Sequence, residues 1–335
     1  MISRDDFDVA LIPGMRERLA ESYKRFRAAH AAFQQEESRV AVRSTERTSC
    51  PGCGAPSGEA QLLFTSRAMR HVRCPRCRLV YTRDILADED DRALYQPNSA
   101  MIAYLDLKDG PDYTFLESRK AAYLASLAAP HAPKAGPFLD VGCSTGALMA
   151  AARDLGFDVY GLDANPHMAA RARALFGERV TTGYFPDAIP ASWPSFSVIS
   201  ILDLLEHMVE PRAFLAELRA RLADGGLLLV QVPNFDSLVI QLEGPDNGNF
   251  CHGHWQHFTA TTLSQLLGSA GFAEIHRETI ISEQDRIMAF PKEAVLGTLK
   301  RIAPGYEGEG NLSAEEIHRR FLGYKLVGLF RKEAS

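Results

Sequence analysis

The chain has no hydrophobic run of about 18 or more residues, which is the length that a transmembrane helix requires. Its first six residues, Met1 to Asp6, also lack the basic and then apolar layout of a secretory signal peptide. These two absences predict a cytoplasmic location and no membrane partner. The net charge of -5 gives no overall attraction to a phosphate backbone, so nucleic acid is not the expected partner. We therefore expect a small-molecule substrate.

The chain of 335 residues is longer than a typical single domain of roughly 100 to 200 residues. We expect a helical arm over 1–48, a small cysteine-bearing module over 49–90, a helical linker or lid over 91–135 and a large domain over 136–335. Apolar residues recur at helical spacing in the arm, which predicts a packing role or a homodimer contact.

Cysteine is scarce, with six residues in the chain, but four of the six lie in two close pairs. Cys50 and Cys53 form one C-x-x-C turn, and Cys74 and Cys77 form a second about 20 residues later, which is the layout of a zinc ribbon. Four thiolates close a tetrahedral site, so the pattern predicts a structural Zn²⁺ that staples a module too small for a large core. Core cysteines without metal and a thioredoxin-like redox pair are alternatives that fit the spacing less well.

A basic stripe surrounds the second pair of cysteines and contains no acidic residue. It consists of Arg67, Arg70, Arg73, Arg76, Arg78 and Arg83. Such a stripe binds phosphates or a carboxylate-bearing partner, or it is a solvated face.

A cofactor-binding pattern begins with Phe138 to Val141, an apolar segment that predicts a buried strand. The sequence Gly142-Cys143-Ser144-Thr145-Gly146 follows, and then a segment with apolar residues at helical spacing. A strand, a glycine turn and a helix form a nucleotide-type cofactor site. A second predicted strand ends at Asp163, whose carboxylate is placed to accept hydrogen bonds from two ribose hydroxyls.

The nature of the cofactor follows from departures from the dinucleotide pattern. That pattern requires glycine at positions 142, 144 and 147, whereas Ser144 and Ala147 occupy the last two. Asp140, just ahead of the turn, suits a cationic amino group better than a phosphate.

At this point the sequence resembles the class I S-adenosylmethionine (SAM)-dependent methyltransferases, whose first motif is an acid, one residue, and Gly-x-Gly-x-Gly. Ser144 replaces the middle glycine, which requires the serine to adopt the glycine-like backbone conformation. The resemblance implies an α/β fold, with a Rossmann-like seven-stranded, mostly parallel sheet, helices on both faces and a helical insertion at about 282–322. The cofactor-binding residues that we expect are Asp140, Gly142, Ser144, Gly146, Asp163, Ala164 and Asp203.

Two segments are candidates for the acceptor side. Asp203, Glu206 and His207 form a D-x-x-E-H pattern that resembles the metal-binding E-x-x-E-H of ubiquinone-pathway O-methyltransferases, with Asp in place of the first Glu. The alternative is that Glu206 and His207 only hold their loop. His254 and His257 match an H-x-x-H-F-T segment that faces the substrate in relatives with a zinc-ribbon front. We predict His254, His257 and His207 as catalytic residues, with one histidine acting as base or substrate ligand.

The alternative role for the second segment is structural, with its histidines bonded to loop carbonyls and a nearby threonine capping the next helix. The combined motifs resemble C-methyltransferases of deoxysugar, polysaccharide and secondary-metabolite pathways, so a nucleotide-linked sugar is the leading substrate class. A zinc-ribbon ribosomal RNA methyltransferase and a non-catalytic methyltransferase-like scaffold remain as other hypotheses.

Overall fold

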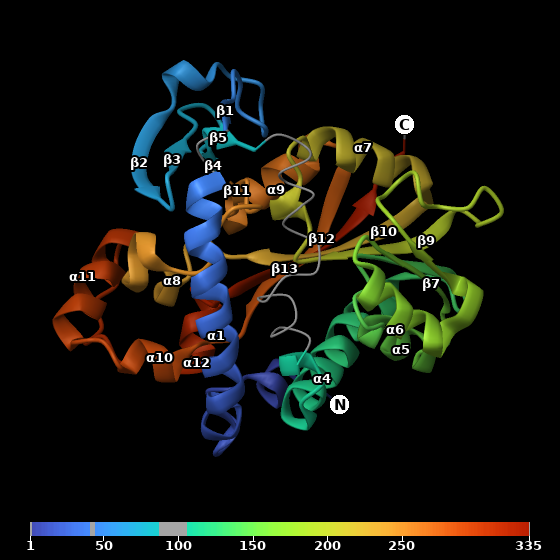
Figure 1. Ribbon diagram of the computed structural model, residues 1–335, viewed down its shortest axis with the longest axis horizontal. Helices are drawn as coiled ribbons and strands as arrows, with labels where there is room; N and C mark the ends of the chain where they lie inside the picture. Colours follow the sequence, from blue (N-terminus) through green and yellow to red (C-terminus); the bar gives the residue numbers. More distant parts are fainter. Residues whose placement is uncertain (1, 41–43, 87–105, 335) are drawn as a thin grey trace.

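The computed structural model describes residues 2–40, 44–86 and 106–334 (Figure 1). Its centre is a seven-stranded sheet with the strand order β12-β13-β10-β9-β6-β7-β8. In chain order the strands are β6 (Pro137–Val141), β7 (Asp158–Asp163), β8 (Val180–Thr182), β9 (Phe196–Leu202), β10 (Leu222–Pro233), β12 (Phe272–Ile280) and β13 (Lys325–Lys332).

The five strands from β10 to β8 are parallel, and β13 runs antiparallel between β10 and β12. Strands covered on both faces have nearly continuous apolar sequences, as the run from Val198 to Leu202 shows. The prediction of a seven-stranded, mostly parallel sheet is confirmed.

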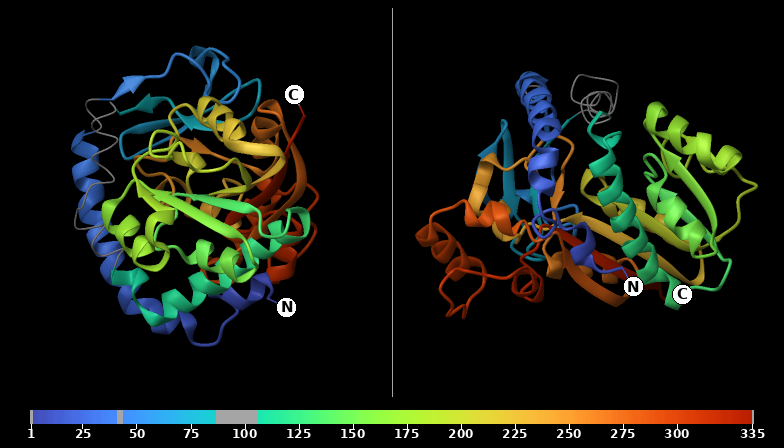
Figure 2. Two further views of the ribbon diagram at one scale, coloured as in Figure 1. Left: turned by 90° about the vertical axis from the view of Figure 1, so that its right-hand side faces the viewer. Right: turned by 90° about the horizontal axis from the view of Figure 1, so that it is seen from below.

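Helices cover both faces of this sheet (Figure 2). The helices that share a core with one face are α4 (Pro111–Ala128), α5 (Ala147–Asp154) and α6 (Pro166–Phe176), and those of the other face are α7 (Pro211–Arg221) and α9 (Ala260–Ser269). Successive residues of β10 alternate between these cores, with Leu227 and Leu229 in the first and Leu228 and Val230 in the second. This is the period of two that a strand imposes on its side chains.

The cysteine-bearing module lies against the face that carries α7 and α9 (Figure 1). Its strands are β1 (Thr45–Glu46), β2 (Gln61–Ser66), β3 (Met69–Arg73), β4 (Val80–Thr82) and β5 (Asp84–Ile85). The strand β11 (Gln256–His257) comes from the large domain and completes a sheet with the order β11-β4-β3-β2. Backbone hydrogen bonding therefore joins the module to the segment after β10.

The remaining helices lie at one end of the molecule. They are α1 (Met15–Val40), α8 (Leu238–Glu243), α10 (Gln284–Met288), α11 (Lys292–Ile302) and α12 (Ala314–Arg319). Arg16 of α1 binds Asp285 of α10 with Nε to Oδ2 at 2.6 Å, so the arm contacts the insertion of the same chain. The helices α10 to α12 lie within the predicted insertion at 282–322.

The boundary expected near residue 90 lies outside the described residues. The segment division and the homodimer contact therefore stay predictions. Within the described part of the chain, no helix combines the length and apolar character needed to cross a membrane.

Candidate active site

The turn between β6 and α5 has a backbone conformation that favours glycine. Gly142, Ser144 and Gly146 have positive φ values of 80°, 50° and 87°. Ser144 thus takes the left-handed conformation that the substitution for glycine requires. At Gly146 a Cβ atom would lie 2.8 Å from Cε2 of Phe176, so the close approach of α6 also excludes a side chain there.

Asp163 at the end of β7 holds this turn. Its Oδ2 accepts a hydrogen bond from the backbone N of Ser144 at 2.8 Å, and its Oδ1 accepts one from the backbone N of Asn165 at 2.8 Å. Burial raises the pKa of Asp163 and outweighs these two hydrogen bonds. Ala164 follows it, half-buried.

Asp140 is buried below the turn at 3% exposure, and its Oδ1 accepts a hydrogen bond from Ser200 Oγ at 2.7 Å. Burial raises the pKa of Asp140 to about 7. A buried carboxyl at this place gains its charge when a cation arrives. The structure therefore brings Asp140, the glycine turn and Asp163 together.

Lys108 is a residue at this site that the sequence pattern does not reveal. Its Nζ donates to Ser144 Oγ at 2.9 Å, and its positive charge lowers the pKa of Asp140 and of Asp163 against the larger effect of burial. Lys108 precedes α4 and belongs to no motif. Only the folded chain places it beside the turn.

Asp203 follows β9 with a positive φ of 51°. Its Oδ1 accepts from Lys325 Nζ at 2.8 Å and its Oδ2 accepts from Gln231 Nε2 at 2.8 Å. Burial is the largest effect and raises the pKa of Asp203, but the charges of Lys325 and Lys120 and the two hydrogen bonds together hold that pKa below the usual value. Both carboxylate oxygens thus have protein partners, and a cofactor contact by Asp203 stays a prediction.

Glu206, His207 and His254 form a cluster in which one ligand atom of each lies within 4.8 Å of the others. The first two belong to the short helix η6 (Leu205–His207) after β9. The rings of His207 and His254 meet edge to face with centroids 4.6 Å apart. Burial raises the pKa of Glu206 to about 8 and lowers that of His207 to about 4. The pKa of His254 is also well below its usual value because of burial.

The cluster is adjacent to the glycine turn because β9 and β6 are neighbouring parallel strands. The carboxyl ends of such strands share one edge of the sheet, where ligands bind in open α/β folds. The side chain of Leu204 lies 3.8 Å from where a Cβ of Gly142 would be. The cofactor turn and the cluster thus border the same edge.

His257 is in a different place. Its Nε2 lies 3.0 Å from Nδ1 of His71 on β3, and the rings of Phe64 and Phe250 flank the pair. Burial places the pKa of His257 well below its usual value. The structure therefore brings together two of the three predicted catalytic histidines and puts the third between the module and the large domain.

The segment that carries these histidines is fixed from both sides. The backbone N of Trp255 donates to the carbonyl of Glu206 at 2.8 Å, and the backbone N of Thr82 in β4 donates to the carbonyl of Trp255 at 3.0 Å. Thr259 caps α9, since its Oγ1 accepts from the backbone N of Thr262 at 3.1 Å. The threonine cap and the histidine cluster occur together in this segment. A structural role and a role at the substrate therefore do not exclude each other.

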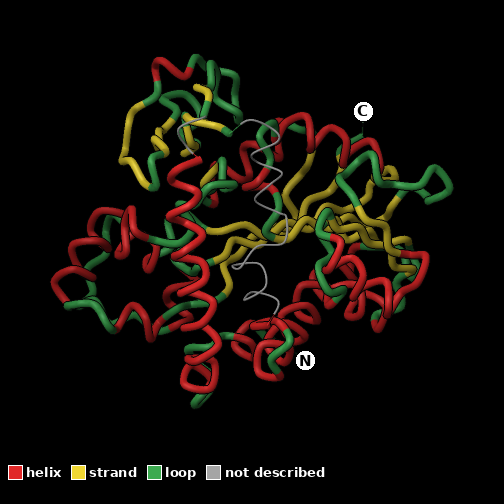
Figure 3. Tube along the Cα trace, viewed as in Figure 1, coloured by secondary structure: helices red, strands yellow, loops and turns green. Residues whose placement is uncertain are grey.

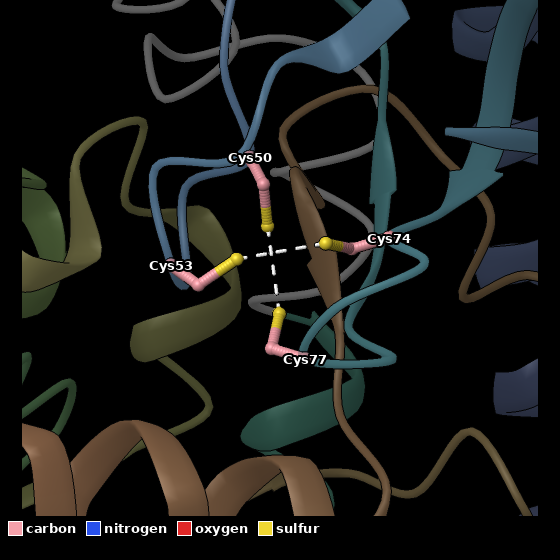
Figure 4. Close-up of side chains that lie close together, drawn as sticks. All are labelled: Cys50, Cys53, Cys74 and Cys77. Atoms are coloured by element: carbon pink, nitrogen blue, oxygen red, sulfur yellow. Dashed lines mark hydrogen bonds between the residues drawn. The ribbon is translucent and has the colours of Figure 1, made fainter. Parts of the chain in front are cut away.

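The four cysteines of the module converge on one point (Figure 4). The Sγ atoms of Cys50 and Cys77 are 3.6 Å apart, and those of Cys53 and Cys74 are 3.5 Å apart. All four Sγ atoms lie within 4.8 Å of one another. The two turns have matching hydrogen bonds, Gly54 N to Cys50 O at 2.9 Å and Arg78 N to Cys74 O at 3.1 Å.

Acidic residues from outside the stripe pair with part of the basic stripe. Arg70 binds Asp84, and Arg70 and Arg83 both bind Glu46. Arg76 lies 3.6 Å from Glu59. The stripe therefore carries less net positive charge than its sequence indicates.

Comparison with known proteins agrees with this geometry. Residues 114–277 match a family model described as a methyltransferase domain. Over 204 residues the chain is 29% identical to a ubiquinone biosynthesis O-methyltransferase of Cereibacter sphaeroides, which covers 57% of this chain and 77% of the relative. The chain is a SAM-dependent methyltransferase. SAM is therefore the cofactor expected at the glycine turn.

Other relatives of the methyltransferase match shorter segments. A 2-methyl-6-phytyl-1,4-hydroquinone methyltransferase of Synechocystis is 34% identical over 102 residues, or 29% of this chain and 32% of that protein. Another Cereibacter sphaeroides O-methyltransferase is matched over 62% of its length. Among solved structures, a Burkholderia thailandensis 1,6-didemethyltoxoflavin-N1-methyltransferase aligns with a TM-score of 0.47 and 18% identity, covering 82% of this chain and all of that one.

Proposed function

We propose that the methyltransferase transfers the methyl group of SAM to a small-molecule acceptor whose reacting atom binds at the cluster of Glu206, His207 and His254. The observation that carries this proposal is the position of the cluster. It follows β9, beside the glycine turn that follows β6, so acceptor and methyl donor meet at one edge of the sheet.

The chemistry needs little else from the protein. A side chain of the cluster takes a proton from the acceptor. The electron pair left on the acceptor then forms the bond to the methyl carbon. The sulfur–methyl bond breaks, and S-adenosylhomocysteine leaves as a neutral thioether. Burial lowers the pKa values of His207 and His254, so both imidazoles are neutral near pH 7. This makes them weaker bases, but each neutral ring has an unprotonated nitrogen that takes a proton from an acidic acceptor. Positioning supplies much of the remaining rate.

The acceptor class that we propose first is a nucleotide-linked sugar, based on the resemblance of the combined motifs to sugar C-methyltransferases. The curated relatives support a second class, a hydroxylated quinone or hydroquinone, since their names describe methyltransferases of that chemistry. An RNA substrate is less well supported, because acidic side chains pair with Arg70, Arg76 and Arg83 in the basic stripe.

The experiment is a screen of nucleotide sugars and of hydroxylated quinones for formation of S-adenosylhomocysteine by the wild-type protein. The active acceptor is then tested with His254→Ala and with His131→Ala, an exposed histidine outside the site. We expect the His254 variant to lose at least about a hundredfold in kcat, which is the low end for loss of a proton-transfer group. An unchanged kcat would remove His254 from the proposal.

We also propose a structural Zn²⁺ held by Cys50, Cys53, Cys74 and Cys77. A zinc–sulfur bond of about 2.3 Å places tetrahedral ligands about 3.8 Å apart, close to the sulfur distances of 3.5 and 3.6 Å found here. Four thiolates leave no open position, so the ion would hold the module and take no part in methyl transfer. Metal analysis should give about one cysteine-bound zinc per chain in the wild type and about one zinc per chain fewer in a Cys74→Ser variant.

A further inference from the structure

The carboxyl group of Glu206 is buried without a hydrogen-bond partner among the described residues. Glu206 is 1% exposed, and neither of its carboxylate oxygens has a hydrogen-bond partner among the described residues. A buried carboxylate without partners is costly, so such a group binds a proton or a cation. The side chains around Glu206 indicate whether a proton or a cation binds there.

The imidazoles of His207 and His254 lie beside this carboxyl group. His254 Nδ1 lies 3.0 Å from the carbonyl of Asn249, and His207 has a hydrogen bond with the backbone of Gly253. A neutral imidazole that donates one N–H to a carbonyl keeps a lone pair on its other nitrogen. Metal-ligating histidines are oriented by such bonds to backbone carbonyls.

We propose that Glu206, His207 and His254 bind a divalent transition-metal ion, at a second site separate from the four cysteines. Their ligand atoms lie within 4.8 Å of one another. Bonds of about 2.1 Å to nitrogen and oxygen require separations of about 3 to 3.5 Å, which lie within this limit. The site joins a carboxylate and an imidazole from η6 to an imidazole from the segment before β11.

Asp203 is not part of this ligand set, although it belongs to the D-x-x-E-H pattern. Its two oxygens accept from Lys325 Nζ and Gln231 Nε2, both at 2.8 Å. This ion pair neutralises the ammonium group of Lys325, which would otherwise repel a cation beside Glu206. The fold thus divides the pattern, with Asp203 balancing Lys325 while Glu206 and His207 face His254.

The ligand set also selects the class of ion. Two imidazole nitrogens and one carboxylate oxygen suit Mn²⁺, Fe²⁺, Co²⁺, Ni²⁺ or Zn²⁺, whereas Mg²⁺ and Ca²⁺ prefer oxygen ligands. Three protein ligands leave coordination positions open. His207 and His254 are half-buried residues, so an acceptor is able to reach an ion there.

An acceptor hydroxyl bound to this ion would lose its proton to water more readily, and His207 and His254 would then act as ligands instead of as bases. This last step rests on the proposed function, because it requires the acceptor to bind at the cluster. The metal site itself does not depend on that step.

The test adds Co²⁺ to the zinc-loaded protein and measures bound metal per chain after dialysis, together with the visible spectrum. The wild type should retain one cobalt in addition to its zinc, with the weak bands of nitrogen and oxygen ligands and without the strong sulfur-to-cobalt absorption of a thiolate site. Glu206→Gln, which keeps the side-chain shape, and His254→Ala should each bind cobalt at least about tenfold more weakly. His252→Gln alters a histidine of the same segment outside the cluster and should retain cobalt.

Zinc content and circular dichroism show that each variant is folded. The proposal is overturned if the wild type binds no cobalt beyond its cysteine site, or if folded Glu206→Gln and His254→Ala proteins both keep wild-type affinity. Methyl transfer measured with and without added metal distinguishes failure of the metal site from failure of the proposed function. Metal-independent turnover by a protein that binds no cobalt would leave the proposed function standing and remove the metal site alone.

Discussion

Binding of the cofactor should depend on pH because Asp140 is buried beneath the glycine turn. Burial raises the pKa of this carboxyl to about 7 in the cofactor-free protein. The resemblance to class I methyltransferases places the ammonium group of the cofactor at Asp140, and a cation binds the ionised carboxylate better than the neutral acid. Affinity should therefore be complete above pH 7 and fall as the pH decreases through 7.

The size of the effect follows from the fraction of ionised Asp140. With a pKa of about 7, this fraction decreases from about 0.9 at about pH 8 to about 0.1 at about pH 6, so the Kd should rise about tenfold, or about 1.4 kcal/mol. Calorimetric titration with S-adenosylhomocysteine between about pH 6 and about pH 8 measures this change in Kd. The matched control is Asp140→Asn, which should bind more weakly at pH 8 and show a flat profile. Equal pH dependence in the wild type and the variant would refute the assignment.

Three further results are expected. Gly146→Ala should destabilise the protein by about 1 to 3 kcal/mol in urea unfolding, because φ is 87° and the new Cβ would lie 2.8 Å from the Phe176 ring; an unchanged midpoint would contradict this account of the turn. Leu228→Ala should cost about 2 to 5 kcal/mol in the same assay, since Leu228 is fully buried in the sheet core, and a loss below 1 kcal/mol would show that the core collapses around it. Cys74→Ser should lower kcat while the Kd of S-adenosylhomocysteine stays within about twofold, because β4 pairs with β11 next to His254; a parallel loss of cofactor affinity would mean that the module supports the whole domain.

The features that the sequence predicted correctly are local. The glycine turn could be located because strand, turn and helix follow one another over about 20 residues, and Ser144 takes the left-handed conformation that its position requires. The resemblance to class I methyltransferases also implied the seven-stranded, mostly parallel sheet. In these regions the periodicity of the chain and the backbone conformation determine the structure directly.

Long-range pairs could not be predicted in this way. Lys325 meets Asp203 across 122 positions only because β13 inserts beside β10, and His257 meets His71 across 186 positions because β11 joins the module sheet. The sequence shows His254 and His257 as equivalent members of one motif. They point to different surroundings because one precedes β11 and the other lies in it.

The most direct test of the account is a calorimetric comparison of S-adenosylhomocysteine binding by the wild type and by Asp163→Ala. The structure places Asp163 at the end of β7, where its oxygens hold Ser144 and Asn165, and we predict that its carboxylate also binds the ribose. We expect about one equivalent bound per wild-type chain and at least a tenfold weaker Kd in the folded variant, because the carboxylate accepts charge-assisted hydrogen bonds. Wild-type affinity in a folded Asp163→Ala protein would show that the cofactor binds elsewhere and would contradict the account.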